Sequence, residues 1–365
     1  MLSFKLVLSF VIAATASPIL HLSQLLPRQD IETPINGSLP NVTIFATGGT
    51  IASQGTSNTQ TTGYSVGLGV QQLVDAVPEI LSFANIRGYQ VSNVDSGSVN
   101  QTISLKLARL INEELARDDI SGVVITHGTD TLEETAFFLD LTINSTKPVV
   151  VVGAMRPATA LSADGPLNLY QAVTLAASPN AVGRGAMISL NDRIGSAFYT
   201  TKNNANSLDT FFSTEAGQLG FFINQVPYFY YEPAVPIGKT HFDLSGADSL
   251  PLIDILYAHQ DMDPELFNST VEHGASGIVL AGVGAGGMSR VAAAAAEAVY
   301  NATAIPMVAS HRSPDGFVPA DEDAFIVASG FLNPQKARIL LQLAIQAGYD
   351  NDDIKNLFAR GYPSP

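Results

Sequence analysis

The chain has 365 residues, of which 46% are hydrophobic and 14% charged, so it is long enough to bury a large core and to form two domains. Its formal net charge of -15 disfavours binding to nucleic acid and to anionic lipid. The absence of cysteine excludes disulfides, thiolate metal sites and a cysteine nucleophile.

Residues 1–17 have the pattern of a secretory signal peptide. A single early positive charge, Lys5, precedes the apolar stretch Leu6–Ala14 and the small residues Ala14-Thr15-Ala16. This stretch is too short to span a bilayer, and no later apolar run is longer, so no membrane anchor is expected. The sequence therefore predicts a secreted protein, extracellular or at the cell wall, with a flexible or processed arm over 18–40. Glycosylation is predicted at the six Asn-x-Ser/Thr sites, which are Asn36, Asn41, Asn100, Asn144, Asn268 and Asn301.

The segment 41–232 is predicted to be a larger N-terminal α/β domain with a doubly wound, mostly parallel, flavodoxin-like sheet. Continuous apolar runs predict strands, and these are 42–46, 88–94, 122–126, 148–152 and 185–190. Apolar residues at helical spacing predict the helices 103–115, 132–141 and 166–177. An aromatic stretch over 220–231 indicates a hairpin.

The segment 233–251 is rich in Pro, Gly, Ser and Asp and is interpreted as an interdomain linker. A smaller C-terminal α/β domain is predicted over 252–365. Its expected strands are 253–257, 277–281 and 306–309, and its expected helices are 289–300 and 335–346.

Polar residues follow the strands of the larger domain, where open parallel sheets bind ligands. The four strand ends read Thr47-Gly48-Gly49-Thr50, Asp95-Ser96-Gly97-Ser98, His127-Gly128-Thr129-Asp130-Thr131 and Gly153-Ala154-Met155-Arg156-Pro157. Hydroxyls, a carboxylate and backbone N–H groups are therefore expected to converge on one edge. Each signal also has a structural interpretation: Asp130 or Thr131 could cap the next helix, with Glu133 or Glu134 completing a capping box.

The stretch Gly282-Val283-Gly284-Ala285-Gly286-Gly287 fits the dinucleotide-binding pattern G-x-G-x-x-G after a predicted strand. The acid expected about 20 residues later is missing, because the chain there reads Ser310-His311-Arg312. The glycines are equally explained by close helix–strand packing. No cofactor is therefore expected, and no metal, since the histidines lack metal-ligand spacing.

Four motifs stand out along the chain, and these are Ala46-Thr47-Gly48-Gly49-Thr50-Ile51-Ala52, the segment 126–136 that contains His127-Gly128-Thr129-Asp130, Val152-Gly153-Ala154-Met155-Arg156-Pro157, and the segment 328–338 that contains Asn333-Pro334-Gln335-Lys336. Together they resemble the motifs of the secreted, type II L-asparaginases of bacteria and fungi, and the likeness covers nearly the whole mature chain.

The resemblance implies hydrolysis of the side-chain amide of L-asparagine to L-aspartate and ammonia, through an acyl-enzyme on Thr50. Tyr64, after a mobile loop from Ala52 to Gly63, would lie beside this nucleophile. Thr129, Asp130 and Lys202 would form a second hydroxyl–acid–base group. Ser96 and Asp130 would hold the substrate α-carboxylate and α-ammonium, respectively. The resemblance also implies a homotetramer of two tight dimers, in which the neighbouring subunit closes each site.

Several alternatives stay open at this stage. The group that deprotonates Thr50 is not identified, and the acid from the neighbouring subunit could be Asp315, Asp321, Glu322 or Asp323. The alternative functions are a relaxed glutaminase–asparaginase and a non-catalytic secreted amino-acid-binding protein.

Overall fold

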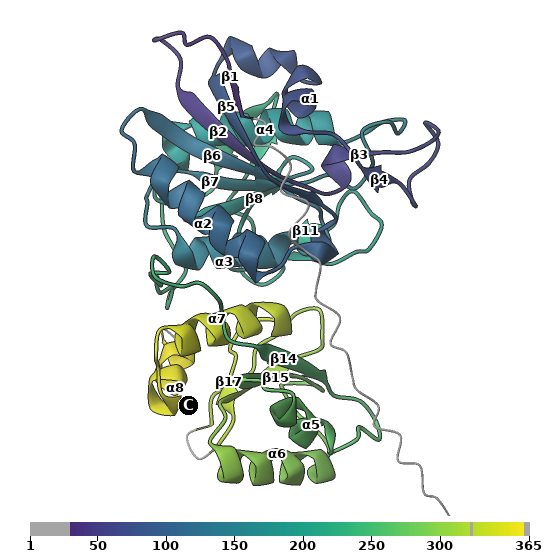
Figure 1. Cartoon of the computed structure of the whole chain (residues 1–365), viewed down its shortest axis with the longest axis vertical. Helices are drawn as coiled ribbons and strands as arrows, with labels where there is room; N and C mark the ends of the chain where they lie inside the picture. The colour runs from purple at the N-terminus through teal and green to yellow at the C-terminus, as the bar shows by residue number, and fades with distance from the viewer. Residues whose placement is uncertain (1–29, 322–323, 361–365) are drawn as a thin grey trace, which may run out of the picture.

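A computed structural model describes residues 30–321 and 324–360, which form two α/β units (Figure 1). The predicted signal peptide and residues 18–29 of the predicted arm lie outside the described residues. The first unit contains a nine-stranded sheet in the order β1-β5-β2-β6-β7-β8-β9-β12-β13. These strands are β1 (Ile31–Glu32), β2 (Asn41–Gly48), β5 (Asn85–Val94), β6 (Ile120–Thr126), β7 (Val149–Val152), β8 (Ala186–Leu190), β9 (Arg193–Ser196), β12 (Gly220–Ile223) and β13 (Val226–Phe229).

The middle of this sheet, β5-β2-β6-β7-β8, is parallel, and helices cover both of its faces. Helices α2 (Gln101–Leu115) and α3 (Leu132–Thr142) contribute buried side chains to the core on one face, and α1 (Val70–Asp75) and α4 (Gly165–Ala177) to the core on the other. Burial from both sides explains why β6 and β7 are continuously apolar. The predicted α/β class and doubly wound sheet are confirmed.

The described end of the predicted flexible arm is instead held against the sheet. Strand β1 pairs antiparallel with β5, and the Asn36 amide donates to Asn85 Oδ1 at 2.8 Å. The side-chain amide of Asn85 in turn donates to the carbonyls of Asn36 and Leu39. The expectation of a flexible arm is therefore corrected for residues 30–40, which a single buried asparagine organises.

Short elements complete the first unit at both edges of the sheet. They are the 3-10 turns η1 (Thr50–Ala52), η2 (Pro78–Ser82), η3 (Ser96–Ser98) and η4 (Pro179–Ala181), and the strands β3 (Ser53–Gln54), β4 (Ser65–Val66), β10 (Thr201–Lys202) and β11 (Phe211–Phe212). The pairs β3–β4 and β10–β11 are separate two-stranded ribbons, and β12–β13 is the hairpin expected over 220–231.

The second unit is a four-stranded parallel sheet in the order β14-β15-β16-β17. Its strands are β14 (Ile253–Tyr257), β15 (Gly277–Gly282), β16 (Met307–His311) and β17 (Val327–Ala328), and its helices are α5 (Leu266–Glu272), α6 (Arg290–Thr303), α7 (Pro334–Gln346) and α8 (Asn351–Ala359). Helix α7 packs on β14, β15 and β16 and also against α3 of the first unit (Figure 1).

One hydrophobic cluster spans the two units. Its buried members run from Phe45 and Phe137 in the first unit to Leu341 and Phe358 in the second. The segment 233–251 belongs to the same cluster, because Phe242, Leu244, Ala247 and Leu250 are buried in it. This segment is irregular as expected of a linker, but its apolar side chains fix it in place.

Within residues 30–321 and 324–360, no helix combines the length and apolar character that a membrane span requires.

Candidate active site

The carboxyl ends of β2, β5 and β6 meet at one point of the sheet edge. Gly49, after β2, has φ of 81°, and a Cβ placed on it would lie 2.1 Å from the Gly128 nitrogen. A Cβ on Gly128 would in turn lie 2.8 Å from the Ser96 hydroxyl. Only residues without a side chain allow this approach, and it brings together the residues that follow each glycine, Thr50 and Thr129.

Thr50 and Tyr64 are in direct contact. The Thr50 Oγ1 and the Tyr64 hydroxyl oxygen are 3.0 Å apart and share a hydrogen bond, and both residues are half-buried. The antiparallel pairing of β3 with β4 closes the loop between them and returns Tyr64 to Thr50. The predicted neighbourhood of these two residues is thus present, although the sequence gives no local pattern that requires the contact.

The loop between β3 and β4 is folded. The side chain of Gln60 accepts from the Thr56 amide at 2.6 Å and donates to the carbonyls of Thr62 and Gly63. The Gly55 amide donates to Thr159 Oγ1 at 2.8 Å, which ties the loop to the segment after β7. The polar side chains that favour a loop by composition therefore hold this one in a defined shape.

Lys202, Thr129 and Asp130 form a second group at the same edge. The Lys202 ammonium donates to Thr129 Oγ1 at 3.0 Å and to Asp130 Oδ1 at 2.6 Å. The Lys202 side chain is 12% exposed, whereas that of Asp130 is 80% exposed. The carboxylate therefore bonds the lysine while presenting itself to solvent, where a cationic group of a ligand could reach it.

Ser96 lies in the turn η3 and is buried. Asp95 shapes this turn by accepting from the Ser98 amide and hydroxyl at 3.1 and 2.8 Å. Thr131 donates its hydroxyl to the Ser96 carbonyl at 2.7 Å. The turn that presents Ser96 is therefore tied to the segment that carries Thr129 and Asp130.

The capping interpretation of Asp130 and Thr131 is wrong. Thr131 is the N-cap of α3 by position, but no side chain caps this helix. Glu133 instead accepts from Gln335 at 2.7 Å and Glu134 pairs with Arg338 at 3.1 Å, so both reach α7 of the second unit. Burial raises the pKa of Glu134 above its usual range, against the opposing effect of Arg338.

His127 is fully buried directly before this segment. Its Nδ1 lies 2.8 Å from the Gly128 carbonyl oxygen and its Nε2 lies 2.8 Å from Thr135 Oγ1. A neutral ring that donates from Nδ1 and accepts at Nε2 satisfies both bonds. Burial lowers the pKa of His127 to about 4. Its role is therefore structural, and in the described part of the chain no three His, Asp or Glu side chains are grouped as a metal site would require.

The glycine-rich stretch after β15 is closed on itself. Val283 and Gly287 exchange two backbone hydrogen bonds of 2.8 Å, and a Cβ on Gly282 would lie 2.4 Å from the Gly286 carbonyl carbon. The backbone N–H groups of Val283 and Gly287 are thus used within the turn and do not point to a bound pyrophosphate. The glycines allow close packing within the turn and of Gly286 against Ala309 and Val318, rather than the helix–strand packing that was the alternative to a dinucleotide site.

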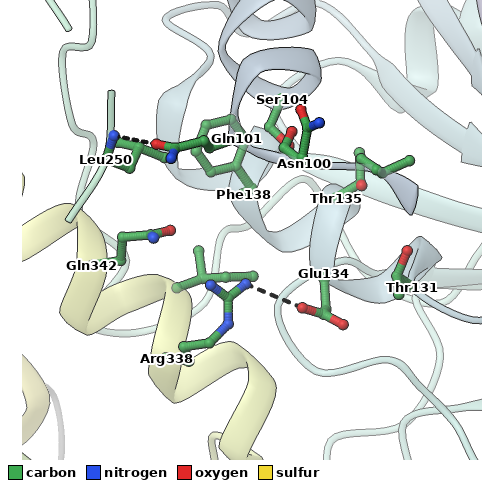
Figure 2. Close-up of a pocket in the computed structure, with 12 residues that line it drawn as sticks. Asn100, Gln101, Ser104, Thr131, Glu134, Thr135, Phe138, Leu250, Arg338 and Gln342 are labelled. Atoms are coloured by element: carbon green, nitrogen blue, oxygen red, sulfur yellow. Dashed lines mark hydrogen bonds and ion pairs between the residues drawn. The ribbon is translucent and has the colours of Figure 1, made fainter. Parts of the chain in front are cut away.

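A cavity of about 210 Å³ lies between α2, α3 and α7 (Figure 2). None of the six predicted catalytic and substrate-binding residues lines it, although Thr131, next to Asp130, does. Glu134 and Arg338 face each other across it, and Gln101 holds the Leu250 amide at its upper edge. The cavity marks the seam between the two units behind the candidate site.

The six predicted glycosylation sites fall on two kinds of surface. Asn41 is half-buried, with its side-chain amide donating to the Asp119 carbonyl at 2.8 Å. The other five are exposed, and these are Asn36, Asn100, Asn144, Asn268 and Asn301.

Of the four acids that could come from the neighbouring subunit, Glu322 and Asp323 lie outside the described residues.

Two family models match this chain, and several proteins are similar to it over most of their length. A family model described as asparaginase, N-terminal, matches residues 41–235, and one described as glutaminase/asparaginase C-terminal domain matches 252–358. The chain is 53% identical to a probable L-asparaginase 1 of Schizosaccharomyces pombe, covering 90% of this chain and 91% of that protein. It is 53% identical to L-asparaginase 2-3 of Saccharomyces cerevisiae, covering 92% and 94%.

A solved structure shares the fold. It is that of a probable cytoplasmic L-asparaginase from Campylobacter jejuni, with a TM-score of 0.84 and 40% identity, covering 88% of this chain and 99% of the other.

The predicted localisation is corrected by these comparisons. The Campylobacter protein is described as cytoplasmic, and a Haemophilus influenzae relative, 43% identical over 88% of this chain and 93% of its own length, is described as periplasmic. Both contradict the expectation of an extracellular or cell-wall protein, which rested on a segment outside the described residues.

Proposed function

The chain belongs to the asparaginase family, and on that premise we propose that it hydrolyses the side-chain amide of L-asparagine to L-aspartate and ammonia. The observation that carries this proposal is the meeting, at one sheet edge, of two threonine hydroxyls that each have a polar partner. Thr50 has the Tyr64 hydroxyl at 3.0 Å, and Thr129 has the Lys202 ammonium at 3.0 Å.

In the proposed reaction Thr50 is the nucleophile. Its Oγ1 bonds to the side-chain amide carbon, the carbon–nitrogen bond breaks, and the nitrogen leaves as ammonia after gaining a proton. Water then cleaves the resulting ester, which releases aspartate and restores the hydroxyl. A threonine hydroxyl needs a proton acceptor for this step, and the contact with Tyr64 supports a proton path through that phenol.

The remaining predicted residues are assigned to binding and proton transfer. Thr129 and Lys202 form the second hydroxyl–base group. Asp130 binds the α-ammonium of the substrate, which its 80% exposed carboxylate supports. Ser96 binds the α-carboxylate, and its position beside Gly128 supports this role because it lies within the same cluster.

We further propose that the chain works as a homotetramer of two tight dimers, each site being closed by the neighbouring subunit. Exposed apolar side chains on the edge strand β14 and just before it support association, and these are Leu252, Ile255 and Tyr257. Sedimentation velocity at several protein concentrations tests this assembly, and a monomer throughout would refute it.

The activity is tested by ammonia release from L-asparagine, L-glutamine and D-asparagine. We expect the highest rate with L-asparagine and its loss in Thr50→Ala. The matched control is Thr174→Ala, because the Thr174 hydroxyl bonds only the Tyr170 carbonyl within α4. Equal rates with L-glutamine would favour the relaxed glutaminase–asparaginase. Reversible binding of L-asparagine without ammonia release would favour a binding protein and refute the proposal.

A further inference from the structure

Lys336 is a buried lysine that crosses from the second unit into the first. It lies in the first turn of α7, and only 2% of it is exposed. Its ammonium donates to the Phe198 carbonyl at 3.0 Å and to the Thr200 carbonyl at 2.6 Å. Helix α7 of the C-terminal unit is thus hydrogen-bonded to the backbone segment 198–200, which leads into β10.

The Lys336 ammonium is buried even though burial disfavours its charged form. Burial lowers the pKa of Lys336 to about 8, and the acidic groups that act on it, Glu133 and Asp140, both lie on α3. These two acids have hydrogen-bond partners of their own, since Glu133 accepts from Gln335 and Asp140 from Lys239. An apolar side chain would fill the same space without the desolvation penalty. The role of the charged ammonium is therefore to hydrogen-bond the Phe198 and Thr200 carbonyls.

The segment that Lys336 bonds continues directly into β10, which ends at Lys202. Strand β10 has two residues and pairs only with the two-residue β11, so it lies outside the nine-stranded sheet. A second contact from α7 reaches it, because Asn333 donates to Thr201 Oγ1 at 3.1 Å. Asn333 also caps α7 by accepting from the Lys336 amide at 3.1 Å. The first turn of α7 therefore supports the two residues on either side of the Thr200–Thr201 peptide bond.

We propose that Lys336, with Asn333, is a positioning residue that holds the β10 backbone so that the Lys202 ammonium reaches Thr129 and Asp130. The catalytic part of this inference rests on the proposed hydrolysis, whereas the geometric part concerns Lys202 alone. In this arrangement the second unit of each chain shapes the site of that same chain, through the Phe198 and Thr200 carbonyls and the Thr201 hydroxyl.

The test compares Lys336→Met with Lys147→Met. Lys147 is the matched control because its ammonium also bridges two backbone carbonyls, those of Leu115 and Arg117, at the opposite edge of the sheet. For hydrolysis of L-asparagine by the intact assembly, we expect Lys336→Met to lower kcat about 10- to 100-fold while KM changes by less than about threefold. Lys147→Met should keep the parent kcat, and Lys336→Arg, which retains charge and donors, should recover part of it.

A second measurement does not depend on activity. The rate at which a small acylating ester labels Lys202 is read by peptide mass spectrometry on the folded protein. Release of β10 should expose the 12% accessible Lys202 side chain and raise this rate several-fold in Lys336→Met but not in Lys147→Met. If Lys336→Met fails to fold, Asn333→Ser replaces it, since serine still caps α7 but does not reach Thr201.

The outcomes separate the two proposals. No ammonia release by the parent refutes the proposed function, while faster labelling of Lys202 still supports positioning. Unchanged labelling of Lys202 in a folded variant overturns the positioning role, whatever the activity. A kcat loss equal in Lys336→Met and Lys147→Met also overturns it, because a general loss of stability would then suffice.

Discussion

His127 should make the stability of this protein fall in mild acid. The unfolded chain takes up a proton on this ring near pH 6.5, whereas burial lowers the pKa of the folded state to about 4. Between these values the unfolded state binds more protons, so the free energy of unfolding falls as the pH is lowered through this window. The contribution of His127 is complete above about pH 6.5 and lost near pH 4, and it amounts to about 3 kcal/mol.

The assay is urea denaturation at a fixed protein concentration, at several pH values between 7 and 4. His127→Gln, which cannot titrate, should show a smaller decrease than the parent by about 3 kcal/mol. Thr135→Val is the control, because it removes the hydrogen bond to Nε2 but keeps the ring. The free energy of unfolding of Thr135→Val should be about 1–2 kcal/mol lower than the parent's at every pH, and it should depend on pH as the parent's does. Equal decreases in the parent and His127→Gln would refute the reasoning.

Two further predictions concern a glycine contact at the site and an ion pair at the amino-terminal end of β5. Gly49→Ala should lose about 3 kcal/mol of stability together with activity, because its Cβ would overlap Gly128 at a positive φ; an unchanged melting temperature would contradict this. Arg87→Met should cost about 2–3 kcal/mol in urea denaturation, because it leaves the 7% exposed Glu114 carboxylate without its guanidinium partner at 3.3 Å. Adding Glu114→Leu to that variant should recover most of the loss, and a double variant no more stable than Arg87→Met would show that the charge was not the cause.

The strands that carry the site could be predicted because their sequences are unambiguous. A run such as Val149–Val152 favours a strand covered on both faces, and its observed bounds differ from the predicted ones by one residue. The agreement is poorer for β5, which begins at Asn85, three residues before the predicted start at 88. Strand β1 could not be predicted in this way, because two residues have no periodicity. It forms because the side chain of Asn85, distant in sequence, satisfies the backbone beside it.

The gathering of polar residues at this sheet edge was predictable, but the contacts among them were not. Polar residues after parallel strands indicate a ligand-binding edge, which is where Thr50 and Thr129 lie. The contact of Lys202 with Thr129 joins residues 73 positions apart, and no local rule fixes such a pair. Lys336 belongs to the 328–338 motif, but in the sequence it cannot be distinguished from an ordinary surface lysine of a helix. Only its burial against the Phe198 and Thr200 carbonyls distinguishes it.

The hydrophobic cluster that runs through both units also bears on how the molecule moves. Because Phe137 and Leu341 belong to one buried cluster, rotating the units against each other would expose apolar surface that both keep from water. Native-state hydrogen exchange should therefore show α3 and α7 opening together, at nearly the free energy of global unfolding.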